Sequence, residues 1–237
     1  MQSIKKLFRN IYYEEDIYTL ASYTNGQWNY ELENVPKTIN NVRHGQTAIV
    51  IGNGLDRLTF DLKYLKKSKL QTYGCNALYR DFNPDFLIAV GTEMCNEIAT
   101  SGYCDNHVVY AYASEIVRQP KKFHLIPQNP TWNAGSLAAY LACFDGHTKV
   151  YLLGFDGNDT PGYSNNIYNN TPGYYSDFKD QNDLYWSLTM TQVFKTYLFV
   201  DFVLVNSTGR GYMPTAWQNV PNLRRISYRD LVLECDL

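Results

Sequence analysis

Asparagine and glycine residues recur where short apolar stretches of the chain end, and groups of this kind can bind a ligand. Four predicted strands end in such residues: Gly52-Asn53-Gly54, Asn76, Gly154-Phe155-Asp156 and Asn206. The carboxyl ends of parallel strands share one edge of a sheet, where ligands bind. Because an amide both donates and accepts hydrogen bonds without adding charge, the pattern predicts a polar, uncharged pocket at that edge.

Two places along the chain could bind phosphate. The glycines of 52–54 would let backbone N–H groups approach an anion, and a helix is predicted over 58–67. A second helix is predicted over 133–144, with Asn133 as its N-cap and Asn133-Ala134-Gly135-Ser136 as an anion-binding start. The alternative for 52–54 is a plain tight turn, because the third glycine of the dinucleotide fingerprint is missing.

Asp156 is the acidic residue best placed for chemistry. A carboxylate at a strand end could bind ribose hydroxyls, hold a metal or act as a base, and the alternative is a loop cap. The four histidines and five cysteines show no catalytic or metal-binding spacing. We therefore expect no metal site and no structural zinc, and interpret the cysteines as reduced thiols in a cytoplasmic protein.

Strand-like and helix-like segments alternate from residue 47 onward. Strands are predicted over 47–51, 70–76, 85–91, 107–111, 122–126, 149–156, 199–206 and 224–227, and further helices over 93–100, 184–197 and 228–233. This alternation predicts an α/β, Rossmann-like fold with a mainly parallel sheet and helices on both faces. The Gly-, Pro-, Asn- and Tyr-rich segment 157–183 has the length and composition of a lid or binding loop.

The first 45 residues differ from the remainder. Aromatic residues crowd 11–33, and Asn25-Gly26 between two β-prone stretches predicts a hairpin. We expect an aromatic-rich extension over 1–45 and one nucleotide-binding domain over 46–237. The basic start, 1–9, lacks the apolar core of a secretory signal; we expect a helix docked on the domain, with a membrane-surface helix as the alternative.

Overall charge excludes some function classes. The chain has 21 basic and 23 acidic residues, a net charge of −2, which argues against a broad nucleic-acid surface. No apolar run approaches the roughly 20 residues of a membrane span. Tyrosine reaches 21 residues, a composition that suits sugar or partner contacts, including those of a homo-oligomer.

An ordered set of short motifs resembles a known family. Ile49-Val50-Ile51-Gly52-Asn53-Gly54, Gly74-Cys75-Asn76, Ala134-Gly135 and Val150-Tyr151-Leu152-Leu153-Gly154-Phe155-Asp156 occur in this order. They resemble those of the bacterial sialyltransferases that use CMP-sialic acid, and of related domains that include an archaeal pterin pyrophosphokinase. The resemblance covers about residues 47–235.

The resemblance implies roles for individual residues. It implies nucleotide contacts for Gly52, Asn53, Gly54 and Asn76, and donor-phosphate contacts for Ala134 and Gly135 with Asn133 and Ser136 beside them. It also implies lid tyrosines, with Tyr163, Tyr168, Tyr174 and Tyr175 as candidates. The chain departs from the family in two places: 157–183 lacks the histidine base, and Thr131-Trp132 replaces an arginine. Asp156, Asp177 and Asp180 are the remaining candidates for the base.

These observations predict a glycosyltransferase that moves a sugar from a nucleotide-sugar donor, CMP-type favoured, to a glycan-like or other hydroxyl acceptor. No cofactor is required. One alternative is a non-catalytic binding or assembly protein that retains the fold. The other is a pyrophosphokinase-like phosphotransferase, which would need magnesium and ATP.

Overall fold

The structure is a computed structural model of the 237-residue chain. It describes the backbone of residues 2–8, 17–24, 27–34, 47–127, 130–157, 165–174 and 183–237, and the side chains of those from 47 onward except 183 and 184.

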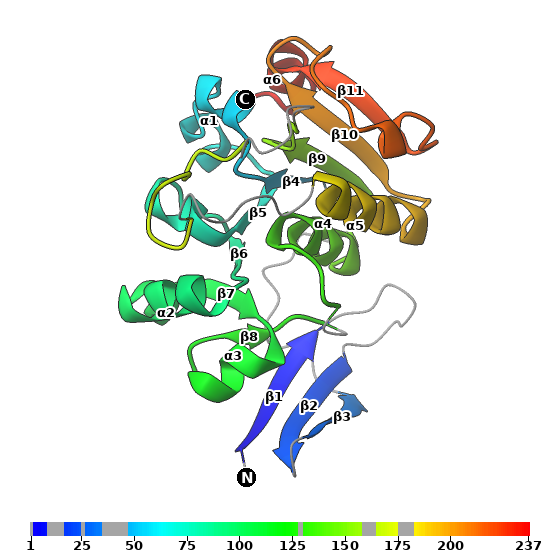
Figure 1. Cartoon of the computed structure of the whole chain (residues 1–237). Coiled ribbons are helices and arrows are strands. Elements are labelled where there is room, and N and C mark those ends of the chain that lie inside the picture. Colours follow the sequence, from blue (N-terminus) through cyan, green and yellow to red (C-terminus); the bar gives the residue numbers. More distant parts are fainter. Residues whose placement is uncertain are drawn as a thin grey trace.

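One large sheet organises the described residues from 47 onward. Its eight strands are all parallel and follow the order β11-β10-β9-β4-β5-β6-β7-β8 (Figure 1). The strands are β4 (Thr47–Ile51), β5 (Gln71–Cys75), β6 (Phe86–Ile88), β7 (Val108–Ala111), β8 (His124–Leu125), β9 (Lys149–Leu153), β10 (Asp201–Asn206) and β11 (Leu223–Ser227). The predicted Rossmann-like, parallel α/β architecture is confirmed.

The side of the sheet on which successive strands are added changes at its centre. From β4 the chain adds β5 to β8 on one side, and then crosses back to place β9, β10 and β11 on the other. β4 and β9 are therefore neighbours, with Thr47 opposite Lys149 and Ile51 opposite Leu153. In doubly wound folds such a reversal opens a crevice at the carboxyl ends of the two strands.

Helices cover both faces of the sheet. One face carries α4 (Ala134–Phe144) and α5 (Asp183–Thr196), and the other carries α1 (Lys63–Lys66), α2 (Thr92–Thr100), α3 (Ala113–Arg118) and α6 (Tyr228–Cys235) (Figure 1). Short 3₁₀ helices are η1 (Leu55–Thr59), η2 (Asn76–Arg80), η3 (Tyr103–Asp105) and η4 (Thr215–Trp217). Successive residues of β4 alternate between the two cores, because side chains along a strand point to opposite faces.

The helix predicted over 58–67 is wrong. The chain forms η1 after the first loop, breaks at Phe60, and only then makes the single turn of α1. Phe60 is extended, with φ −108° and ψ 123°. Its ring is buried and packs edge-on against Tyr228, with 5.1 Å between ring centroids. Burial of Phe60 against a distant residue thus overrides local helix propensity, and no α-helix begins at the Gly52-Asn53-Gly54 loop.

The extension forms β1 (Gln2–Phe8), β2 (Ile17–Thr24) and β3 (Gln27–Asn34), which pair antiparallel. Thr24 pairs with Gln27, as the hairpin signal predicted, although the two turn residues lie outside the described residues. The helix expected over 1–9 is wrong, because 2–8 pair with β2 as a strand. In the part of the chain that the structure describes, no helix combines the length and apolar character needed to cross a membrane.

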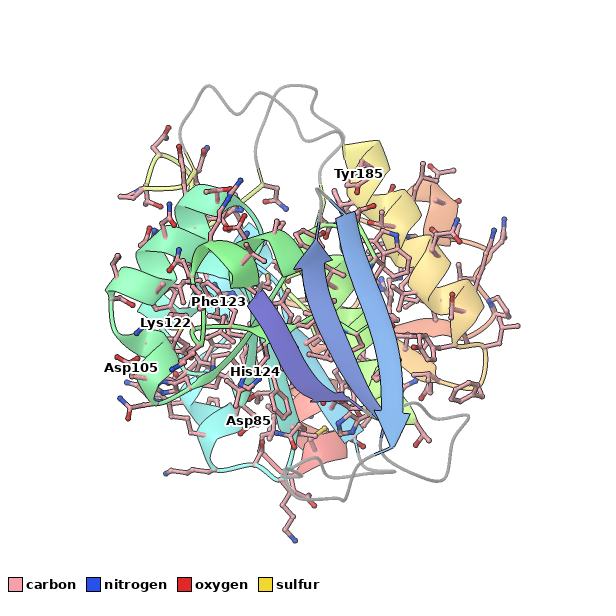
Figure 2. The ribbon with its side chains drawn as sticks, turned by 90° about the horizontal axis from the view of Figure 1, so that it is seen from below. Asp85, Asp105, Lys122, Phe123, His124 and Tyr185 are labelled. Carbon is pink, nitrogen blue, oxygen red and sulfur yellow. The ribbon has the colours of Figure 1, made fainter. Side chains whose placement is uncertain are left out.

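The β8 edge of the sheet differs from the predicted elements. The sequence missed the six-residue α3, and β8 is limited to His124 and Leu125. Lys122, just before β8, pairs with Asp105 of η3 at 2.7 Å, and both lie on the same side of the molecule (Figure 2). Both side chains are partly exposed, so this ion pair adds little to stability.

An ion pair joins α6 to the opposite edge strand and makes stability pH-dependent. Arg224 of β11 donates two hydrogen bonds to Glu234, at 3.1 and 2.8 Å, and Tyr151 donates a third at 2.7 Å. The Arg224 guanidinium and the Tyr151 hydroxyl lower the pKa of Glu234 from 4.5 to about 2. Since the folded-state pKa lies below the unfolded one, this contribution is complete above about pH 4.5 and is lost as the pH falls towards 2.

We therefore expect Glu234→Gln to lower the free energy of unfolding at pH 7 by up to about 1 kcal/mol, because the pair is solvent-screened. The difference from wild type should shrink between about pH 4.5 and 2, measured by urea denaturation across that range. A difference that stayed constant with pH would mean that packing rather than ionisation is responsible.

Candidate functional site

A cavity of about 570 Å³ lies at the carboxyl ends of the central strands, at the point where strand order reverses. The loops after β4, β5, β6 and β9 and the start of α4 form its walls. The sequence-predicted residues among its lining are Gly52, Asn53, Gly54, Asn76, Asn133, Ala134, Gly135, Asp156 and Tyr174. The sequence therefore brought nine of the 22 lining residues together from separate parts of the chain.

The glycines of the first loop are required by packing against the β9 loop. A Cβ on Gly52 would lie 2.4 Å from the carbonyl oxygen of Gly154, and one on Gly54 would lie 2.0 Å from Asp156 Oδ1. The N–H of Gly54 donates to that same Gly154 carbonyl at 3.0 Å. Gly154 itself has φ +71°, a conformation that favours glycine. Close backbone contact at the switch point thus explains these glycines without any ligand.

Asn53 and Asn76 line the cavity and hold its wall through side-chain hydrogen bonds. Asn53 Nδ2 donates to the Cys75 carbonyl at 3.2 Å, and Asn53 is nearly buried. Asn76 has φ +48°, and its Oδ1 accepts from the N–H of Val90 at 2.8 Å. Asn76 therefore fixes the loop between β6 and α2 while it lines the cavity.

The start of α4 has free backbone donors. Asn133 is its N-cap, as predicted: its Oδ1 accepts from the N–H of Ser136 at 2.9 Å. Ser136 is fully buried, bonds Thr189 of α5 at 2.8 Å and lies behind the cavity wall rather than in it. No described residue accepts from the N–H groups of Ala134 and Gly135, which line the cavity. Such donors at a helix start suit an anion.

Asp156 holds loops together. Its Oδ2 accepts from the N–H of Asp56 at 2.9 Å and from Asn165 Nδ2 at 2.9 Å. Its Oδ1 is buried with no partner among the described residues. Burial raises the pKa of Asp156 above its usual value, although these hydrogen bonds act in the opposite direction. The Asp156 carboxylate therefore mainly holds the loops of the cavity wall together.

Residues 165–174 form a strap over the carboxyl edge of the sheet. The N–H of Ile167 donates to the Asn53 carbonyl at 2.8 Å. The Tyr168 hydroxyl accepts from Arg57 at 3.3 Å and donates to Asp81, so Tyr168 anchors the strap and does not line the cavity. Tyr174 lies at the other end of the strap and lines the cavity.

Arg80 also holds the strap, and sequence reasoning missed it. Its Nη1 donates to Thr171 Oγ1 and its Nη2 to the Pro172 carbonyl, both at 2.8 Å, while it pairs with Glu97 of α2. Arg57, buried beside Tyr168, was missed as well. An arginine in a polar segment carries no local signal of such a contact, because its partners lie far away in the sequence.

Other predicted residues lie elsewhere. Tyr163, Tyr175, Asp177 and Asp180 lie outside the described residues. The loop after β10, expected at the same pocket, does not line the cavity; instead Ser207 donates to the carboxylate of Asp56 at 2.7 Å.

Two of the lining residues that the sequence did not predict carry a large aromatic or a charged side chain. Trp186 of α5 forms part of the wall and packs edge-on against buried Trp217, with 4.9 Å between ring centroids. Glu93 in the first turn of α2 is exposed and lines the cavity. No Lys, Arg or His is found among the described lining residues, and the carboxyl side chains among them are those of Glu93 and Asp156.

Neither a scan against protein-family models nor a search of curated proteins finds a match to this chain. The assignment of function therefore rests on the fold and the cavity.

Proposed function

We propose that this chain is a sialyltransferase-like glycosyltransferase. Its cavity binds a nucleoside-monophosphate sugar of the CMP type, and the enzyme transfers the sugar to a hydroxyl acceptor. The observation that carries the proposal is the cavity at the strand reversal, into which the free N–H groups of Ala134 and Gly135 open. Nucleotides bind doubly wound sheets at this position, with phosphate at a helix start.

The charge of the cavity favours one phosphate over two. A CMP-sugar brings one phosphate charge to the α4 start, which one helix start can meet, and the carboxylate of a sialic acid is a separate group on the sugar. A pyrophosphate donor brings a second charge and would need a basic side chain or a metal as counter-charge. Among the described lining residues there is no basic side chain to supply it. The proposal therefore requires no metal.

The α4 start, the two asparagines and the strap each contribute to the transfer. The α4 start stabilises the negative charge that develops on the leaving phosphate. Asn53 and Asn76 orient the donor through their uncharged amides. The strap excludes water from the sugar, which limits hydrolysis. Glycan-like molecules offer the hydroxyl that accepts the sugar.

One observation favours a second candidate, a binding or assembly protein without catalysis. Asp156 is the acidic residue that the sequence favours as a catalytic group. One of its carboxylate oxygens accepts two hydrogen bonds, and the other is buried. Such a protein would bind a nucleotide or a partner but turn nothing over.

Thermal unfolding in the presence of nucleotides tests the proposal. CMP at about 100 times its dissociation constant should stabilise the fold by about 2.7 kcal/mol, a rise of about 5–10 °C in melting temperature, without magnesium. UDP should have a smaller effect. A shift with ATP and magnesium alone would instead indicate a pyrophosphokinase-like phosphotransferase, and no shift with any nucleotide would contradict the proposal.

Asn76→Asp separates binding from folding. Aspartate keeps an acceptor for the Val90 N–H and tolerates the positive φ of this position. The added negative charge in the cavity should nevertheless abolish the shift with CMP, while the melting temperature without ligand falls by only a few degrees. An unchanged shift would mean that the nucleotide does not approach Asn76.

A further inference from the structure

Transfer to a hydroxyl requires a group that takes the proton of the acceptor, and the sequence offers no histidine for this task in 157–183. Such transfer is the proposed function, and the base inferred for it depends on that proposal. A base must lie in the cavity, be ionised near neutral pH and have an oxygen or nitrogen free for the acceptor. The described titratable residues of the lining are Cys75, Glu93, Asp156 and Tyr174.

Cys75 and Tyr174 are protonated near neutral pH. Burial raises the pKa of the Cys75 thiol to about 12, and this thiol donates to the Ile51 carbonyl. Burial also raises the pKa of the Tyr174 hydroxyl to about 12, with the nearby Cys75 thiol as a smaller cause. Neither group can accept a proton from an alcohol under these conditions.

Asp156 is ionisable but not available. Its Oδ2 carries the hydrogen bonds from Asp56 and Asn165 that join two loops. Its Oδ1 is covered, and the site of a Cβ on Gly54 lies only 2.0 Å from it. An acceptor hydroxyl could reach neither oxygen without breaking the contact between the β4 and β9 loops.

Among the titratable residues of the described lining, Glu93 remains. Its side chain is exposed, it lines the cavity, and no described residue hydrogen bonds or pairs with its carboxylate. The segment just before Glu93 is held at two positions. The Val90 N–H is held by Asn76, and the Thr92 hydroxyl donates to Glu115 at 3.1 Å. Glu93 thus combines a carboxylate that no described residue contacts with a preceding segment held by two hydrogen bonds.

We propose that Glu93 is the general base of the transfer. A Glu93 oxygen accepts the proton of the acceptor hydroxyl as the acceptor oxygen bonds to the anomeric carbon. The bond between that carbon and the phosphate oxygen breaks, and its electron pair stays on the phosphate of the departing CMP. The proton on Glu93 then returns to water, which restores the carboxylate.

Hydrolysis of CMP-N-acetylneuraminic acid, with water as the acceptor, tests this role in the full chain through the release of CMP. Glu93→Gln removes the base but keeps shape, so kcat should fall at least about a hundredfold. The thermal shift with CMP should persist, since Glu93 does not bind the phosphate. Formate at high concentration should restore part of the activity of Glu93→Ala, because a small carboxylate can occupy the vacated position.

Asp236→Asn is the matched control. Asp236 is an exposed carboxylate at the end of α6, with φ +51°, which asparagine also adopts. Its activity should equal that of wild type. If Glu93→Gln retains activity within about threefold of wild type, the base is another residue and the transferase proposal survives. If wild type binds CMP but releases none from the donor, the base role is refuted, and if it does not bind CMP, the proposed function fails first.

Discussion

Gly52→Ala is expected to lower the melting temperature by about 6–12 °C, corresponding to about 3 kcal/mol in a chain of this length. The new methyl group would lie 2.4 Å from the Gly154 carbonyl oxygen and 3.1 Å from its carbonyl carbon. Both atoms belong to backbone and cannot rotate away. The loops after β4 and β9 must therefore separate, which also deforms the cavity. Thermal unfolding followed by circular dichroism measures the effect.

Gly135→Ala is the matched control from the same cavity. There a Cβ would meet its nearest atoms, in Phe155 and Asn133, at ordinary contact distances of 3.4 and 3.5 Å. Because alanine also favours a helix more than glycine, stability should stay equal or rise by up to about 1 kcal/mol. Equal melting temperatures for the two variants would contradict the contact between Gly52 and Gly154.

Arg80→Met should release the strap from the sheet. The change removes two hydrogen bonds to the strap, at Thr171 and Pro172, and the ion pair with Glu97. We expect the free energy of unfolding to fall by about 2–3 kcal/mol, because hydrogen bonds from a charged donor are worth more than neutral ones. We also expect the affinity for CMP to fall at least tenfold, since Tyr174 of the strap forms part of the cavity wall.

Limited proteolysis separates release of the strap from general instability. Cleavage within 165–174 should accelerate in Arg80→Met far more than cleavage elsewhere in the described chain. Lys122→Met, which removes the exposed pair with Asp105, should change neither the melting temperature nor the cleavage pattern. Uniform acceleration along the chain would mean that Arg80 stabilises the whole domain rather than the strap.

Much of the fold could be predicted from local patterns. The strand 47–51 was predicted to the residue, since a short β-branched run that stops at glycine has few alternatives. Alternation with helices then implied parallel strands, and Asn133 marked the start of α4. The helix over 58–67 failed because Phe60 is extended to meet Tyr228, a contact that no local pattern contains.

The candidate site was predicted in part for a related reason. The carboxyl ends of parallel strands converge whatever the loops contain, so Asn53, Asn76 and Gly135 were placed at one cavity from sequence alone. Their roles were not foreseen. Hydrogen bonds with partners elsewhere in the chain decide that Asn76 supports the Val90 loop, and that Ser136 turns towards Thr189 and away from the cavity.

The sequence by itself determined the parallel α/β class, the cap of α4 and the edge of the sheet at which the cavity lies, because these follow from periodicity and from chain direction. Only the tertiary structure decided that Gly52 faces Gly154, that Arg80 holds the strap, and that Glu93 has a free carboxylate in the cavity. Each of these depends on which distant residues share a space, and that is fixed only when the sheet and helices pack together.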